Sequence, residues 1–508
     1  MLFGKRNTKR PQIDFWLLGT IIAYAMIAVL LLPYFRYHLQ NDSFAYLSLA
    51  ASKTTNAYWG PLLPLLIRGG TWLGLDPLTA IRAPSIIASI GLLLLTGTLK
   101  KNLSLSLGMW RTGVATLGTL LLMKTLDIAT PDILLTFLMA LMMRCAMLHT
   151  IQGAVLAGII GAIGYLTKSV GLPFFLLFTA GIGLEYWLRE RKAFGKIAIR
   201  LGASIAICGA LVSPWIWSIS MEEGKFTIGE SAHIIHATMN PLQDREIPMN
   251  VRGLLPPPSG VALSIWDDPT TLTYEDWSPF TSLEHTVMQL RIIIINATRM
   301  IDVVFKEFWL VWGIAAASIV FSLQRKPSII RSWSRLISGV WILLLGMYLP
   351  IVTDDRYVWI GIILAMALGA ILMNEAMTMY RWDRRQSIVA MTLFFLSFTA
   401  YPSWRTINAF NDGKVIAADA KKAASILRLE GARTASDNWK VGLAFSYYAG
   451  AKYYGRPVMP EDGTEVSKQL KKDGIDIYLM TGKRIDVPGY KEIMTPASSI
   501  RILRSVER

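Results

Sequence analysis

Acidic and basic side chains stand just beyond the ends of several long apolar segments in this sequence. Asp42 follows the first apolar segment, Asp132 opens a later one, Lys168 lies between two others, and Arg356 precedes a late one. A carboxylate held beside a membrane can act as a general base towards a hydroxyl group. Cations at the same depth can stabilise a phosphate that departs with negative charge. These residue types together suit a reaction on a lipid-linked phosphate.

The composition predicts a membrane protein. Of the 508 residues, 53% are hydrophobic and 17% are charged, whereas about a quarter of the residues in soluble domains are charged. The net charge of +16 does not indicate nucleic-acid binding, because the basic residues form short blocks between apolar segments. Cys145 and Cys208 both lie inside apolar segments, which argues against a disulfide framework and against a cysteine metal site.

A membrane-spanning helix needs about 20 mostly apolar residues. By this criterion we expect about eleven spans and therefore a multi-pass α-helical membrane protein. The first span is not a cleaved signal peptide, because its apolar core is long and no small-residue cleavage pattern follows it. The expected spans are 14–34, 83–99, 109–123, 132–148, 153–167, 170–188, 197–219, 303–323, 335–352, 357–375 and 387–402.

Basic residues give these spans an orientation. Blocks of Lys and Arg precede the first span and follow the second, sixth, eighth and tenth. With eleven spans and a cytoplasmic N-terminus, every block is cytoplasmic, as the positive-inside rule requires. Such basic loops favour a bacterial inner (plasma) membrane. The expected divisions are a cytoplasmic tail (1–12), a transmembrane domain (13–402) with outer loops 35–82 and 220–302, and an extracytoplasmic C-terminal domain (403–508).

The C-terminal region differs in composition from the rest of the chain. Charged residues return, residues 414–430 have helical periodicity, and the segments EVSKQLKKDG and IDIYLMTG indicate a helix followed by a strand. A small α/β domain outside the membrane is therefore expected. We find no phosphate loop, metal-spacing motif or nucleophile elbow in its sequence. It is expected to contribute to acceptor recognition or stability.

Each candidate site residue also has a structural interpretation. Asp42 can simply open an amphipathic helix on the membrane surface. In the sequence Thr130-Pro131-Asp132, we expect Thr130 as the N-cap, Pro131 as the first helical residue, and Asp132 as a favourable charge at the helix start. Lys168 can snorkel to the membrane surface. Its position on the outer side, however, runs against the charge bias and favours anion binding.

The order of the polar and apolar segments is distinctive. An acidic residue follows the first span, and then come AYWGPLLPLLIRGGTWLGLDPLTAIRAPSIIASIGLLLL, LDIATPDILLTFLMALMMR, GAIGYLTKSVGLPFFLL and DDRYVWIGIILAMALGA. This order resembles the membrane glycosyltransferases of the GT-C fold, specifically the protein mannosyltransferase and aminoarabinose transferase superfamily. The resemblance covers most of residues 12–400, and the C-terminal tail also resembles an outer domain that many bacterial members carry.

The resemblance implies transfer of a sugar from a polyprenyl-phosphate donor, such as undecaprenyl phosphate, on the outer face of the membrane. The acceptor would be a hydroxyl or phosphate of a lipid, a glycan or a protein, as in lipid A modification or protein mannosylation. Asp42 would be the catalytic base of a single displacement that inverts the anomeric configuration. The donor phosphate would be bound by Lys168, Arg356 and Arg82, with Asp132 and Tyr357 in supporting roles.

The sequence departs from the family pattern at two positions. Asn41 stands at the position where the family often has the first of two acidic residues. This departure argues against a metal site built on paired carboxylates. The requirement for a divalent cation as a cofactor therefore remains open. Ser169 replaces the glycine of the family's LTKG-like segment. In the second outer loop, Trp266, Tyr274 and Trp277 are candidates for stacking on a sugar ring, and equally for an interfacial aromatic belt.

Two other functions remain open at this stage. A transporter or lipid flippase often shows internal repeats and polar residues near the bilayer midplane, and this sequence shows no repeat and few charges inside its spans. A lipid-linked glycan polymerase or ligase would use a diphosphate-linked donor instead. The donor that the protein accepts would distinguish this second alternative.

Overall fold

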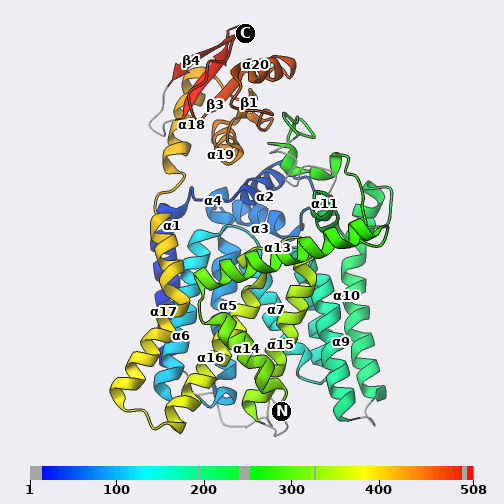
Figure 1. Ribbon diagram of the computed structural model, residues 1–508, viewed down its shortest axis with the longest axis vertical. Coiled ribbons are helices and arrows are strands. Elements are labelled where there is room, and N and C mark those ends of the chain that lie inside the picture. Colours follow the sequence, from blue (N-terminus) through cyan, green and yellow to red (C-terminus); the bar gives the residue numbers. More distant parts are fainter. Residues whose placement is uncertain (1–13, 191–193, 240–251, 325–327, 495–499, 507–508) are drawn as a thin grey trace.

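The computed structural model describes residues 14–190, 194–239, 252–324, 328–494 and 500–506. Long helices stand side by side in a bundle, and a small domain with a β-sheet lies at one end of it (Figure 1). We call this end of the bundle the domain end. The bundle helices are α1 (Phe15–Phe35), α5 (Ala83–Leu103), α6 (Leu107–Asp127), α7 (Asp132–Ala146), α8 (Ile151–Thr167), α9 (Gly171–Arg189), α10 (Phe194–Glu222), α14 (Val311–Ser322), α15 (Ile329–Tyr348), α16 (Trp359–Met379) and α17 (Arg384–Asn408).

Every expected span coincides at least in part with one of these helices, which confirms the multi-pass helical class. Within the described residues, seven helices are by themselves long and apolar enough to cross a membrane, or eight if a bent pair counts as one span. The expectation of about eleven spans is therefore higher than this criterion supports. The helices that do not qualify are short or charged: α7 has 15 residues, α8 has 17, and α6 carries Lys124 and Asp127 near its end.

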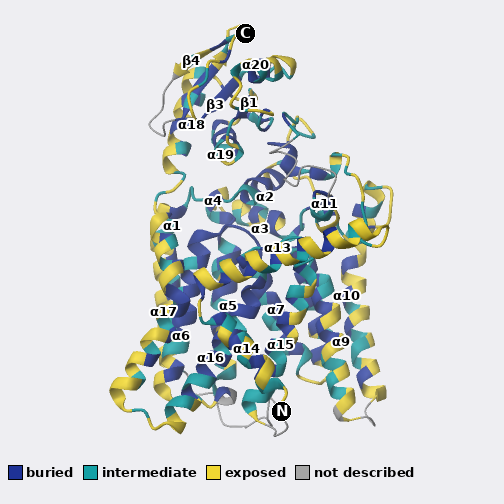
Figure 2. Ribbon diagram, viewed as in Figure 1, coloured by how far each residue is buried: buried dark blue, intermediate teal, exposed yellow. Residues whose placement is uncertain are grey.

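Burial follows the pattern expected for a bundle in lipid. Side chains directed towards the interior are buried, whereas the outer helix surfaces are exposed in the isolated chain (Figure 2). Large apolar side chains such as Leu30, Trp217 and Ile342 are 66–71% exposed on the outside. In water this exposure would be costly, so a lipid environment accounts for it.

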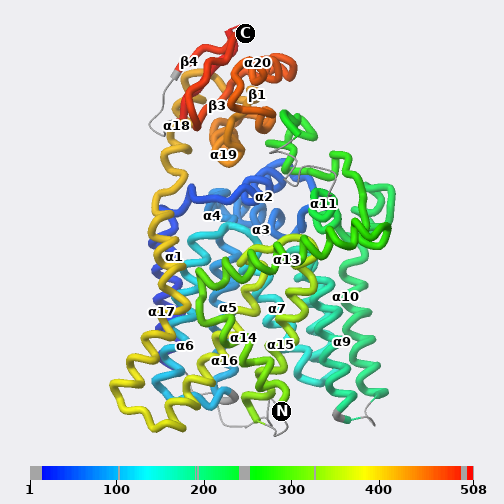
Figure 3. The backbone as a smooth tube through the Cα atoms, in the orientation of Figure 1, coloured from blue at the N-terminus to red at the C-terminus, as the bar shows by residue number. Residues whose placement is uncertain are grey.

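The expected span 303–323 is wrong as a single straight helix. The chain forms α13 (Leu283–Glu307), breaks, and continues as α14 at an angle of 113° to it. α13 crosses the domain end of the bundle instead of running along it (Figure 3). Its charged residues explain this course, because charges are costly in the bilayer core. They are Glu284, Arg291, Arg299, Asp302, Lys306 and Glu307.

Shorter elements cover the domain end. α2, α3 and α4 come from the first outer loop, and α11, η2 and η3 from the second, while η4 leads directly into α16. Their apolar sides pack on each other, for example Phe44 and Ile67, which are 1% exposed. Their bounds are α2 (Asn41–Ser52), α3 (Leu62–Trp72), α4 (Pro77–Ala80), α11 (Ser231–Ala237), η2 (Ile265–Asp267), η3 (Pro269–Thr271) and η4 (Asp355–Val358).

The C-terminal domain contains the helices and strands that the sequence indicates. Its sheet has the strand order β2-β1-β3-β5-β4, in which β1 is parallel to β2 and β3, and β5 is antiparallel to β3 and β4. Buried apolar residues such as Ile477 and Leu479 fill its core. The elements are α18 (Lys414–Leu427), β1 (Arg433–Ser436), α19 (Trp439–Ala449), β2 (Lys452–Tyr453), α20 (Gly463–Lys472), β3 (Ile477–Met480), β4 (Tyr490–Met494) and β5 (Arg501–Ser505).

The second outer loop joins this domain to the bundle. The Tyr453 N–H donates to the carbonyl of Leu263 at 2.8 Å, and the Leu255 N–H donates to the carbonyl of Tyr454 at 2.6 Å. The loop therefore lies along the edge of the sheet formed by β2. On the other side, α19 packs on α2, where Tyr447 is 5.3 Å from Phe44 between ring centroids. These contacts fix the loop over the domain end.

Candidate functional site

Four segments that are distant in sequence bring charged side chains together at the domain end. Asp42 comes from the start of α2, Asp132 from the start of α7, Lys168 from the turn after α8, and Arg356 from η4. All four were expected to act together, and the structure places them in one cluster.

Asp42 is fixed by its helix and by two partners. The N-cap of α2 is Gln40, whose side chain accepts from the Ala129 N–H at 2.9 Å and ties the helix to the turn before α7. Asp42 lies in the first turn and its carboxylate faces the cluster. Its Oδ2 is 2.9 Å from Nη1 of Arg356, and its Oδ1 accepts from Nε1 of Trp266 at 3.3 Å.

Asp132 is the buried centre of the cluster, with 2% of its surface exposed. The expectation that Thr130 is the N-cap is wrong by one residue, because Pro131 is the N-cap of α7. The Thr130 hydroxyl instead donates to Oδ2 of Asp132 at 2.5 Å. Lys168 donates to its Oδ1 at 2.8 Å, and Nη1 of Arg356 lies 3.8 Å from its Oδ2. Such pairing is what allows a carboxylate to remain buried.

Arg356 connects the acidic residues of the cluster. Besides its contacts with Asp42 and Asp132, its Nε lies 3.3 Å from Oδ2 of Asp354. Three carboxylates thus surround one guanidinium, whose planar set of five N–H donors suits carboxylate and phosphate oxygens. Its side chain is 16% exposed, so it remains accessible from the domain end.

The ring of Tyr357 contacts both cations of the cluster, Lys168 and Arg356. Nζ of Lys168 lies 4.4 Å from its ring centroid, and Cζ of Arg356 lies 5.3 Å from it. Tyr348 of α15 stacks on the other side, with 4.6 Å between ring centroids. Cation–π contact of this kind holds a cation in place without using up its hydrogen-bond donors. Lys168 donates one of its N–H groups to Asp132, which leaves donor capacity for a ligand.

The three aromatic candidates of the second outer loop differ in position. Trp266 is 7% exposed and contacts Tyr58, Trp59 and Trp439 at centroid distances of 5.4, 5.5 and 6.1 Å. It borders the cluster, but it is buried among other rings and bonded to Asp42. Its ring is thus packed against protein in this structure.

Tyr274 and Trp277 are held by other residues of the second outer loop. The Tyr274 hydroxyl donates to the carbonyl of Pro269 at 2.9 Å, and Arg252 lies over its ring at 5.0 Å. Trp277 stacks on His236 with 4.5 Å between centroids. The structure gives both residues contacts within the loop, and sugar stacking by them remains a prediction.

Arg82 does not belong to the cluster, and its expected role in binding the donor phosphate is corrected. Its side chain is completely buried. The guanidinium donates to the backbone carbonyls of Thr125 and Leu126 at 3.2 and 2.9 Å, to that of Phe35 at 2.8 Å, and to that of His38. Arg82 therefore holds the end of α1 against the end of α6.

Buried phenols and carboxyls around the cluster have shifted pKa values. Burial, together with the nearby charge of Asp42, raises the pKa of Tyr46 well above its ordinary value, and the same holds for Tyr58. These phenols stay neutral and can only donate or accept hydrogen bonds. Burial also raises the pKa of Asp267 to about 7, although Ser48 and the Leu263 N–H donate to its carboxylate.

The described residues include no group of three or more His, Cys, Asp or Glu side chains arranged to hold a metal ion. In the cluster, the guanidinium of Arg356 occupies the position between the carboxylates. The requirement for a divalent cation stays a prediction.

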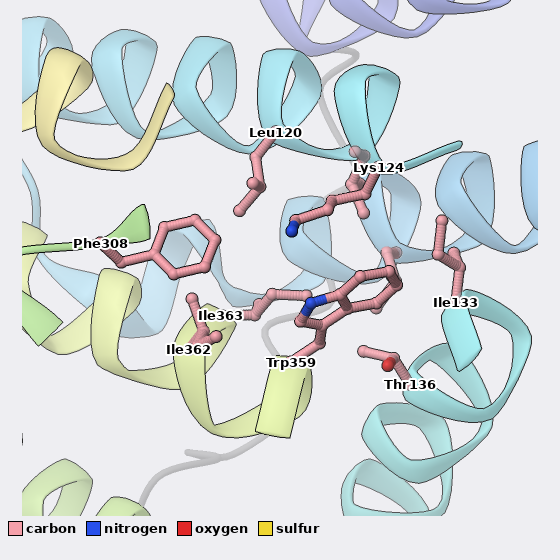
Figure 4. Close-up of a pocket in the computed structure, with 10 residues that line it drawn as sticks. Leu120, Lys124, Ile133, Thr136, Phe308, Trp359, Ile362 and Ile363 are labelled. Carbon is pink, nitrogen blue, oxygen red and sulfur yellow. The ribbon is translucent and has the colours of Figure 1, made fainter. Parts of the chain in front are cut away.

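Apolar space adjoins the cluster inside the bundle. A small cavity of about 20 Å³ is lined by Ile133 and Trp359, which follow the site segments in sequence, and by Lys124 (Figure 4). A second cavity of about 110 Å³ shares Leu92 and Ile363 with it and has an almost entirely apolar lining. It extends away from the cluster, towards Leu103 and Arg144 near the ends of α5 and α7. Both lie between α5, α6, α7 and α16.

The fold and the site together define a multi-pass helical membrane protein with a charged cluster at one end of its bundle. The chain is similar to ArnT from Cupriavidus metallidurans. Its structure in the apo state has 13% sequence identity, a TM-score of 0.43, and coverage of 96% of this chain and 98% of that chain. Its structure bound to undecaprenyl phosphate has 12% identity, a TM-score of 0.45, and coverage of 97% and 98%. No protein family and no curated protein sequence matches the chain.

Proposed function

We propose that this protein is a glycosyltransferase that transfers a sugar from a polyprenyl-phosphate donor to an acceptor on the outer face of the inner membrane. The observation that carries the proposal is the contact of Arg356 with Asp42 at 2.9 Å, beside the Lys168–Asp132 pair at 2.8 Å. A carboxylate that could act as a base and two cations thus share one site at the domain end of the bundle. Reaction on a lipid-linked phosphate needs both kinds of group.

In this proposal Arg356 and Lys168 bind the phosphate of the donor. Both cations are held on the Tyr357 ring, and both retain exposed surface, 16% and 25% of the side chain. Asp132 is 2% exposed and fixes their positions from below. A guanidinium and an ammonium that are fixed before the substrate arrives can stabilise the charge on a leaving phosphate without reorganisation.

Asp42 is the proposed base. The acceptor hydroxyl oxygen forms a bond to the anomeric carbon while the bond from that carbon to the phosphate oxygen breaks. The hydroxyl proton passes to Asp42, and polyprenyl phosphate leaves with its charge stabilised by Arg356 and Lys168. Because Asp42 is ion-paired with Arg356 in the free protein, a donor phosphate that engages Arg356 would loosen this pair and make the carboxylate available.

The remaining parts of the fold are consistent with such a substrate. The larger apolar cavity, which lies between the helices and extends away from the cluster, offers room for a short part of an isoprenoid chain. Among the described residues, the basic residues Lys100 and Arg381 mark the ends of α5 and α16 that lie opposite the domain end (Figure 1). By the positive-inside rule, the cluster and the C-terminal domain then face outwards.

The test uses purified protein in detergent with polyprenyl-phosphate sugars and candidate acceptors, and measures released polyprenyl phosphate by mass spectrometry. Wild-type protein should release it, and Asp42→Asn should lower the rate by about 10²–10⁴-fold, as for loss of a general base. Asp302→Asn is the matched control, since Asp302 is an exposed acid of α13 paired with Lys306. Near-normal turnover by Asp42→Asn would refute the assignment of the base. Release from a diphosphate-linked donor alone would instead indicate a glycan polymerase or ligase.

A further inference from the structure

Charged side chains from four elements meet inside the bundle beneath the candidate site. They are Lys124 and Asp127 of α6, Glu307 of α13, Asp355 of η4 and Arg405 of α17, which we call the buried charge network. Lys124 donates to Glu307 at 2.6 Å and to Asp355 at 2.7 Å. Arg405 lies 2.5 Å from Glu307 and 2.9 Å from Asp127.

The network is buried enough that its members depend on each other. The side chains of Lys124, Glu307 and Asp355 are 3–5% exposed. In a medium of low dielectric constant, a single charge without a partner costs several kcal/mol or more. Removal of one cation would leave two carboxylates facing each other. None of the proposed catalytic steps uses these groups, so a different role is needed to explain them.

Lys124 is the member that ties η4 to the rest of the bundle. Its side chain extends between the rings of Phe308 and Trp359, with Nζ 5.4 and 5.2 Å from their centroids (Figure 4). The indole N–H of Trp359 also donates to Asp355, at 3.3 Å. The Asp355 carboxylate thus has two partners, Lys124 of α6 and Trp359 at the start of α16.

Asp355 lies next to the site in the chain. Asp355 and Arg356 are consecutive, and the turn of η4 directs the Asp355 carboxylate to Lys124 and the Arg356 guanidinium to Asp42. Consecutive Cα atoms are about 3.8 Å apart, so a shift or rotation of Asp355 moves Arg356 as well. Displacement of about 1 Å at a reacting group can cost about 10²-fold in rate.

We propose that Lys124 is a positioning residue: by holding Asp355 it orients η4 and thereby places Arg356 for the donor phosphate. The inference rests on the proposed function, in which Arg356 binds that phosphate. Lys124 itself does not contact the substrate. Its effect on Arg356 passes through Asp355 and not through its bond to Glu307, which separates it from residues that only stabilise the bundle.

The test compares Lys124→Met with the double variant Lys124→Met/Asp355→Asn. The single variant leaves Asp355 and Glu307 without their shared cation and should lose both thermal stability and transfer activity. The double variant removes the opposing charge and leaves the Glu307–Arg405 pair, so its stability should recover. Its affinity for undecaprenyl phosphate, measured by ligand-induced thermal shift, and its turnover should stay at least about tenfold below those of wild type. If both recover in the double variant, Lys124 is only structural and the inference is overturned.

Two further variants keep the result decisive if Lys124→Met does not fold. Asp355→Asn alone keeps the shape of the side chain and weakens its bond to Lys124, and it should lower undecaprenyl phosphate affinity more than it lowers the melting temperature. Glu307→Gln is the matched comparison, since it weakens the other bond of the same lysine but leaves Lys124–Asp355 intact. Equal losses of affinity in these two variants would contradict the proposal.

A measurement without any ligand separates this inference from the proposed function. In a double-mutant cycle on thermal stability, Lys124→Met and Arg356→Met should be non-additive, because the displaced η4 can no longer form the Arg356–Asp42 pair. Additive effects would overturn the positioning role whatever the substrate is. A non-additive cycle in a wild-type protein that neither binds undecaprenyl phosphate nor transfers a sugar would refute the proposed function alone.

Discussion

The guanidinium of Arg356 lies 2.9 Å from the carboxylate of Asp42, although one residue follows the first helix of the bundle and the other precedes one of the last. The pair links the start of α2 to η4 at the domain end of the bundle. It also sets the resting state of the site, because the proposed base and the proposed phosphate ligand neutralise each other until a substrate separates them.

Arg356→Lys tests whether the guanidinium itself is needed. Arg356 meets Asp42 and Asp132 through Nη1 and Asp354 through Nε, and a lysine ammonium cannot reproduce this planar fork. We expect the affinity for undecaprenyl phosphate to fall by at least about tenfold, which corresponds to about 1.4 kcal/mol, with the charge of the site unchanged. Isothermal titration in detergent would measure it. An affinity equal to that of wild type would mean that only the charge of this residue matters.

Trp266→Phe separates positioning of Asp42 from sugar stacking. Phenylalanine keeps most of the ring packing against Tyr58 and Trp59 but lacks the indole N–H that bonds Asp42. We expect kcat to fall about 10- to 150-fold, as for loss of a hydrogen bond of about 1.5–3 kcal/mol to a charged group, while KM and melting temperature change little. Steady-state kinetics with a fluorescent acceptor would show it. A rise in KM for the donor at constant kcat would instead favour stacking on the sugar.

Arg82→Met should act on stability and not on substrate binding. The buried guanidinium donates to carbonyls at the ends of α1 and α6, and methionine would leave these acceptors unsatisfied. A loss of about 3 kcal/mol or more is expected, visible as a lower melting temperature in detergent. The affinity of the folded fraction for undecaprenyl phosphate should match that of wild type. Weaker binding at an unchanged melting temperature would instead support a role for Arg82 in binding the donor phosphate.

The pH dependence of stability should depend on His38, which lies between Asp127 and Asp412 at 3.0 and 2.9 Å. Burial disfavours the charged ring, but hydrogen bonds to these two carboxylates outweigh it and raise the pKa of His38 above its ordinary 6.5. The stabilisation is therefore fully present below pH 6.5 and is lost as the pH rises through the raised pKa of the folded protein.

The measurement is the difference in melting temperature between wild type and His38→Gln over a pH series. The difference should be largest in the acidic range and shrink towards alkaline pH. Taking the difference removes the contribution of other titrating groups that both proteins share. A difference that grows as the pH rises would show that the neutral ring is the form that the fold favours.

Much of the fold could be predicted because hydropathy determines which segments can lie in lipid. The expected spans coincide with helices, although within the part of the chain that the structure describes only seven or eight qualify by length and apolarity. The error at 303–323 arose because an apolar run was extended into the charged end of α13, where Glu307 stops the span. Hydropathy alone does not show that a helix turns by 113° within a few residues.

The cluster of Asp42, Asp132, Lys168 and Arg356 could be anticipated from the order of segments and not from any local spacing. Arg82 was misassigned because an arginine near a helix start looks the same whether it binds a ligand or the backbone. The buried charge network was missed because the expected span ended at residue 123, one position before Lys124. The lysine and the aspartate in the last turn of an apolar helix could have indicated this network, because charged residues at such positions usually have a charged partner.

The edge of the C-terminal sheet has a consequence for how the protein is made. Trp266 reaches Asp42 from a loop that β2 holds by backbone bonds to Leu263 and Leu255, and Trp439 packs on its ring. These holding residues leave the ribosome after the helices that carry Asp42 and Asp132. The helices of the bundle can therefore be inserted before the loop that carries Trp266 is fixed, and the surroundings of the site become complete only when the C-terminal domain folds. A chain truncated before residue 439 would be inserted but would lack this wall of the site.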